Sequence, residues 1–170
     1  MNRRAQPQPL GMEELLQQAV RHILGHRDLD AFLHWMREVI PAVADDEQLS
    51  PDDERRLAYL LGLAVWNALP RPDNDFLPVS APVPNDSAPC PCGSGHRFDA
   101  CCGSAMEREG AGRETDPELP RELLWELLLD ELPDTDLQRA LRLRVVPQPL
   151  FARVADHWLA IDRPGRAVAL

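Results

Sequence analysis

The chain contains no lysine, so all 18 of its basic residues are arginine. Without lysine it cannot contain a phosphate-binding loop of the form G-x-x-x-x-G-K-[ST], which excludes nucleotide-driven motors of that type. The formal net charge is -10, and no long segment is basic. The average field therefore repels a nucleic-acid backbone, and nucleic acid is an unfavourable partner.

Long hydrophobic runs are also missing. No apolar stretch of signal-peptide length follows Arg3 and Arg4, and none approaches the length of a membrane span. We therefore expect a cytoplasmic protein without a membrane span, in which thiols stay reduced.

Apolar residues recur with a helical period through most of the chain, which predicts an all-α fold built as a helical bundle or as helical hairpins. Gly25 and Pro41 are expected to end the first two helices. A third helix is expected to begin with Ser50 as N-cap and Pro51 in its first turn. Its predicted buried face consists of Leu57, Leu60, Leu61, Ala64 and Ala68.

The segment "PRELLWELLLDELP" (120–133) is apolar almost all round, so we expect neighbours to cover this helix on more than one side. Two further helices are predicted around 136–145 and 151–159. The break at "IDRPGRAVAL" weakly resembles a tetratricopeptide-like helix hairpin. Because the chain is still apolar and uncapped at Leu170, we expect a longer native chain or a partner at this end.

Changes in composition divide the chain into five segments. Six prolines fall in residues 70–89, which predicts an extended linker. The expected segments are an N-terminal helical region (1–69), the Pro-rich linker (70–89), a cysteine knuckle (90–103), a polar linker or frayed helix (104–115) and a C-terminal helical region (116–170).

The four cysteines are Cys90, Cys92, Cys101 and Cys102, in the spacing C-x-C-x8-C-C. Four soft sulfur ligands in two close pairs favour one tetrahedral zinc ion. Gly93 and Gly95 allow a tight turn with positive φ, whose amide groups can point at the sulfurs. All four positions would be filled by the protein, so this zinc is expected to be structural and not catalytic.

The sequence "PCPCGSGHRFDACCG" closely resembles the SEC-C motif, a zinc-binding element found at the C-terminus of the SecA translocation ATPase and in small bacterial proteins. The resemblance implies that the four cysteines are zinc ligands. In SecA this element docks the chaperone SecB, ribosomes or lipid. SecA-type motifs usually carry lysines between the cysteine pairs, whereas residues 96–100 here hold Arg97 and Asp99, so a SecB-like or ribosomal partner is an analogy only.

Other candidate sites are weaker. His22 and His26 lie four residues apart but have no acid of an H-E-x-x-H site, so they are expected to be solvent-facing. His34 and His157 each adjoin a tryptophan, which indicates the edge of a core. The acidic run at 45–54 does not alternate as a calcium loop does. The local basic side made by Arg139, Arg142 and Arg144 is expected to pair with nearby acids.

The sequence therefore predicts a zinc-binding adaptor or protein-interaction module that is not catalytic. His96, Arg97 and Phe98 are expected to point outward from the knuckle and to recognise a protein partner. One alternative is an enzyme whose catalytic part lies in the helices or beyond residue 170. Another is a binder of nucleic acid or of the ribosome.

Overall fold

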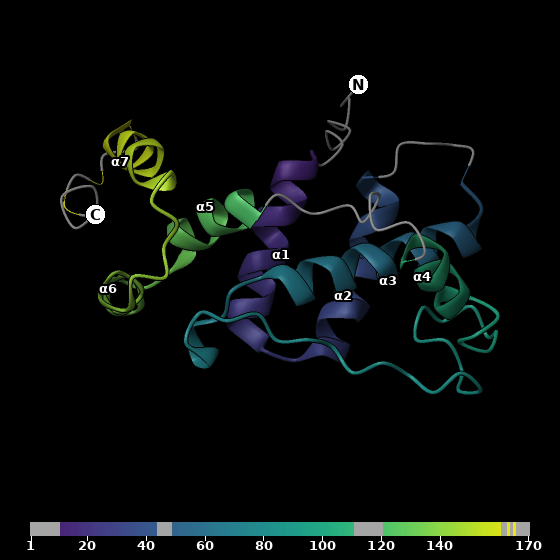
Figure 1. The fold of residues 1–170 in the computed structure, drawn as a ribbon. Coiled ribbons are helices and arrows are strands. Elements are labelled where there is room, and N and C mark those ends of the chain that lie inside the picture. The colour runs from purple at the N-terminus through teal and green to yellow at the C-terminus, as the bar shows by residue number, and fades with distance from the viewer. Residues whose placement is uncertain (1–10, 44–48, 111–120, 161–162, 164, 166–170) are drawn as a thin grey trace, which may run out of the picture.

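The computed structural model describes residues 11–43, 49–110, 121–160, 163 and 165 (Figure 1). Within these residues the fold is all-α, and its only β pairing consists of two isolated bridges. The elements are α1 (Met12–His26), α2 (Leu29–Val43), α3 (Pro51–Ala68), the 3-10 helix η1 (Pro72–Asn74), α4 (Cys102–Gly110), α5 (Arg121–Glu131), α6 (Asp134–Leu143) and α7 (Leu150–Ala160).

Helices α1 and α2 form an antiparallel pair joined by a two-residue turn. Helix α1 continues one residue past Gly25 and ends where Arg27 adopts a left-handed conformation at φ 55°. Helix α2 continues two residues past Pro41, which was expected to end it. A proline near the last turn removes only one backbone donor, so the helix tolerates it there.

Helix α3 begins as predicted. The Ser50 side chain accepts a hydrogen bond from the backbone N–H of Asp53 at 3.2 Å, and Pro51 occupies the first turn. Its predicted buried face is only partly right: Leu57 is 41% exposed, whereas Leu60, Leu61, Ala64 and Ala68 are half-buried. The fully buried positions of α3 lie between the predicted ones: Ala58, Tyr59, Gly62, Leu63, Val65 and Trp66.

The face of α3 shifts because two different partners cover this helix. Gly62 lies against α2 so closely that an added Cβ would lie 2.9 Å from Cδ2 of Leu33. Tyr59 and Leu63 are buried in a cluster with the four cysteines. A periodicity argument assigns one buried stripe to a helix, whereas α3 contributes to two cores.

Helix α5 is covered on more than one side, as predicted. It packs against α1 and against α7, and it buries Leu124, Trp125, Leu127, Leu128 and Leu129. Figure 1 shows α6 and α7 at one end of the molecule and α4 at the other, with α1, α2 and α3 between them.

Residues 70–89 connect α3 to the cysteine knuckle and are largely without helix. Their first part packs against the C-terminal helices, because Phe76 is buried and its ring stacks on Trp125 at 6.0 Å. Arg139 of α6 donates a hydrogen bond to the carbonyl of Pro72 and forms an ion pair with Asp75. This stretch is therefore more than a covalent connection, because it also packs against the C-terminal helices.

Some sequence predictions fall wholly or partly outside the described residues. They include the start of the acidic run at 45–48, the polar linker at 111–115, most of the helix restart after Pro164, and the chain end at Leu170. Among the described helices, none combines the length and the apolar character needed to cross a membrane.

Candidate metal centre

The cysteine knuckle is a short hairpin-like loop that leads into α4. The backbone N–H of Phe98 donates to the carbonyl of Ala88, and that of Cys90 donates to the carbonyl of His96, both at 2.8 Å. These bonds bring the two ends of the loop together. Cys102, the last of the four cysteines, is also the first residue of α4, so a helix holds one end of the site.

Glycines shape the loop at the places where the motif has them. Gly93 and Gly95 have φ values of 82° and 79°, as expected for a tight turn. Gly103 has a different role: a Cβ there would lie 2.8 Å from the carbonyl oxygen of Phe98 and 3.0 Å from its ring. Glycine at position 103 therefore lets α4 start directly against Phe98.

The four cysteine sulfurs meet at one point. All four lie within 4.8 Å of one another and all four residues are buried. The Sγ atoms of Cys92 and Cys101 are 3.6 Å apart, and those of Cys101 and Cys102 are 4.0 Å apart. These distances are too long for disulfides, and the cysteines are free.

The sulfur spacing also tests whether the residues fit a metal. Four ligands at a zinc–sulfur distance of about 2.3 Å in a tetrahedron are separated by about 3.8 Å. The two sulfur–sulfur distances of 3.6 and 4.0 Å lie on either side of that value. With all four sulfurs within 4.8 Å of one another, the thiols can close on one thiophilic ion through small shifts, and four of them complete a tetrahedral shell.

The thiols do not share one electrostatic environment. Burial raises the pKa of Cys102, and it raises that of Cys90 although the backbone N–H groups of Cys92 and Cys102 bond to its sulfur. Burial also acts to raise the pKa of Cys101, but hydrogen bonds from Ser94, the neighbouring thiols and Arg56 lower it to about 6. A bound dication would favour the thiolate form of all four.

The knuckle is not an isolated appendage. Its cysteines and Phe98 share a buried cluster with Leu33 of α2 and with Tyr59 and Leu63 of α3. Sequence reasoning did not find these helix residues as part of the site. They lie 27 or more positions from the nearest cysteine, and nothing in their local pattern indicates which loop covers them.

The expected outward position of Phe98 is wrong, because only 3% of its surface is exposed. The ring is apolar, and placing it under the loop against Gly103 buries area that the small knuckle otherwise lacks. His96 and Arg97 are exposed as predicted, and Arg97 forms an ion pair with Asp99.

The histidine pair on α1 does not form a metal site. The rings of His22 and His26 stack at a centroid distance of 4.2 Å, and His22 also stacks on Trp35 at 5.1 Å. Burial lowers the pKa of His22. Across the described part of the chain, the four cysteines are the only group of three or more potential metal ligands brought together.

The remaining polar candidates have structural partners or lie on the surface. Arg139 pairs with Asp75, which confirms that ion pairing uses this arginine, while Arg142 and Arg144 are exposed. His34 is exposed and lies 3.4 Å from Glu38. The side chain of His157 lies outside what the structure describes.

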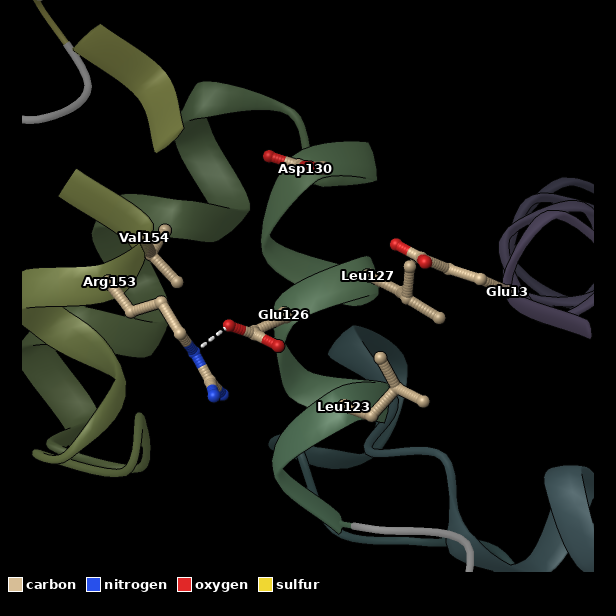
Figure 2. Close-up of a pocket in the computed structure, with 7 residues that line it drawn as sticks. All are labelled: Glu13, Leu123, Glu126, Leu127, Asp130, Arg153 and Val154. Atoms are coloured by element: carbon tan, nitrogen blue, oxygen red, sulfur yellow. Dashed lines mark ion pairs between the residues drawn. The ribbon is translucent and has the colours of Figure 1, made fainter. Parts of the chain in front are cut away.

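A cavity of about 190 Å³ lies between α1, α5 and α7 (Figure 2). Its lining includes the apolar side chains of Leu123, Leu127 and Val154 and the acids Glu13, Glu126 and Asp130. Glu126 pairs with Arg153, and Asp130 accepts a hydrogen bond from the indole of Trp158 at 2.7 Å. Two of the three acids therefore hold α5 and α7 together, which is a structural use.

Comparison with known protein families identifies the segment that contains the four clustered cysteines. The sequence model of the SEC-C motif matches residues 87–104, which contain all four cysteines. Neither the curated proteins nor the solved structures gave a match to this chain. The chain therefore carries a SEC-C motif, a metal-binding element, and the part of it that the structure describes is all-α.

Proposed function

We propose that the protein is a zinc-binding adaptor that presents its SEC-C knuckle to a protein partner and does not itself catalyse a reaction. The observation that carries the proposal is the set of four buried thiols within 4.8 Å of one another inside the segment that matches the SEC-C motif. Soft sulfur ligands in a tetrahedral set favour zinc over hard cations.

A closed set of four thiolates supports a structural role for the ion. When bound, zinc would supply cross-linking and folding free energy to a segment with little regular secondary structure. Cys90, Cys92, Cys101 and Cys102 would fill its coordination shell, so no position would be open for water or substrate. This favours an interaction module over a metal-dependent hydrolase.

The exposed part of the knuckle is the proposed recognition surface. His96 and Arg97 lie outside, whereas Phe98 supports the loop from within. Because Arg97 is paired with Asp99, the loop offers little net positive charge. The proposed partner is therefore a protein that binds through shape and hydrogen bonding more than through a strong positive field. By analogy with other SEC-C motifs, the candidates are a SecB-like chaperone and the ribosome. The proposed location is the cytoplasm.

Zinc content tests the metal half of the proposal. The purified wild-type protein should contain one zinc per chain, and Cys101→Ser should reduce that content because serine is a poor ligand for this ion. Ala105→Ser, a change of similar size in α4, should retain the metal. Full zinc retention in Cys101→Ser would show that the ligand set is wrong.

Capture of the partner from native cytosol tests the adaptor half. Wild-type protein should retain a specific protein that both the four-cysteine variant and His96→Ala/Arg97→Ala fail to retain. A variant on the opposite end of the molecule, Arg142→Ala, should retain it. A partner that binds the four-cysteine variant and wild type equally would place recognition outside the knuckle.

A further inference from the structure

A zinc ion held by four thiolates carries a formal charge of -2, and burying such a charge is costly unless cations or hydrogen-bond donors lie beside it. All four cysteines are buried. The knuckle itself offers only Arg97 as a permanent cation, and that side chain is 62% exposed and paired with Asp99. The knuckle does supply hydrogen bonds to the sulfurs, from backbone N–H groups and from Ser94. Compensation by full positive charge from within the knuckle is therefore weak.

Arg37 of α2 reaches the knuckle at Gly93, directly beside Cys92. An added Cβ at Gly93 would lie 3.0 Å from Nη1 of Arg37, so the missing side chain leaves room for the guanidinium. The Nε atom of Arg37 is buried without a hydrogen-bond partner, and Nη2 lies 3.5 Å from Nδ1 of His34. Among the described residues, this guanidinium has no carboxylate within ion-pair distance.

Arg56 of α3 approaches the site at another point. It lies one turn of α3 before Tyr59 and Leu60, which pack in the cysteine cluster. Its guanidinium also lowers the pKa of the Cys101 thiol. The Nε atom of Arg56 is also buried without a hydrogen-bond partner. Its Nη1 lies 3.4 Å from Asp53, a long and exposed ion pair that competes only weakly for the guanidinium.

We propose that Arg37 and Arg56 complete the metal site by neutralising the two excess negative charges of the zinc tetrathiolate from α2 and α3. The inference rests on the proposed zinc binding and deepens it. The knuckle would then depend on the helical region for charge balance as well as for apolar cover. The two arginines are positioning residues, since the sulfurs alone would contact the ion.

Chelator competition tests this role by measuring zinc affinity of the full-length protein. Arg37→Met/Arg56→Met keeps much of the aliphatic packing but removes both charges, and it should weaken zinc binding about 10- to 100-fold, as is typical for residues that support metal ligands. Arg37→Lys/Arg56→Lys should recover part of the loss, because it restores the charge. Arg55→Met is the matched control on α3, since Arg55 pairs with Asp52, and it should bind zinc as wild type does.

The outcomes separate the two proposals. Wild-type protein that binds no zinc overturns both. Wild-type protein that binds one zinc, with equal affinity in the Met/Met variant and in Arg55→Met, overturns only the role of the arginines. Equal losses in the Met/Met and Lys/Lys variants would also overturn it, because they would indicate packing and not charge. If the double variant does not fold, Arg37→Gln and Arg56→Gln carry the same test singly, each with about a 10-fold loss.

Discussion

At the scale of single residues, Phe98 shows how burial changes the interpretation of a motif. An aromatic ring between two cysteine pairs is compatible with a surface contact or with a small core. In the structure the Phe98 ring lies against Gly103 and belongs to the same buried cluster as the cysteines. Its role in the protein is therefore packing, and of the three residues 96–98 only His96 and Arg97 are exposed.

Replacing Phe98 tests that role. Phe98→Ala should destabilise the zinc-loaded protein by about 3–5 kcal/mol, the usual cost of removing a buried aromatic ring. His96→Ala should change the stability by less than about 0.5 kcal/mol, because the side chain is exposed. Denaturant unfolding followed by circular dichroism measures both. Equal stability of the two variants would show that Phe98 does not stabilise the knuckle by packing inside it.

At the scale of elements, α3 decides how the two cores meet. Gly62 faces Leu33 and Met36 of α2, while Tyr59 and Leu63 belong to the cysteine cluster. The close approach of α2 and α3 at Gly62 also sets the spacing from which Arg37 and Arg56 reach the knuckle. A change in helix spacing is therefore expected to affect the metal site.

Gly62→Val should destabilise the protein by about 1–3 kcal/mol, because a side chain at this position overpacks the α2–α3 contact. Gly25→Val is the control, since a Cβ at Gly25 has no atom within 4 Å. Thermal unfolding of the two variants measures the difference. Unchanged stability in Gly62→Val would mean that the helices can separate at little cost.

At the scale of the whole molecule, the described buried residues outside the knuckle that pack around the cysteines come from the N-terminal helices α2 and α3. The cysteine cluster contains residues of α2 and α3, and α4 packs on α3. Helices α6 and α7 lie at the opposite end of the molecule (Figure 1). Loss of the metal should therefore be felt unevenly along the chain.

Chelation of zinc tests this unevenness by hydrogen exchange. Amides of the knuckle, of α2 near Leu33 and of α3 near Tyr59 should lose protection, whereas those of α6 should change little. At free zinc 1,000-fold above its dissociation constant, the metal contributes about 4 kcal/mol to stability, so the loss should be measurable. Loss of protection confined to residues 88–103 would contradict the coupling.

Local signals in the sequence determined much of this protein. Helical periodicity predicted the all-α fold, Ser50 and Pro51 predicted the start of α3, and the almost wholly apolar α5 predicted its cover on several sides. The cysteine spacing predicted which four thiols meet. These features depend on residues close together in the chain, where backbone geometry restricts the possible arrangements.

Only the tertiary structure decided which face of α3 is buried, that Phe98 lies inside, and that Arg37 lies against Gly93 of the knuckle. Each of these depends on a contact between segments separated by tens of residues, brought together by the path of residues 70–89. Periodicity identifies a buried stripe when one neighbour covers a helix. It cannot show that a second neighbour, the cysteine knuckle, covers the next stripe.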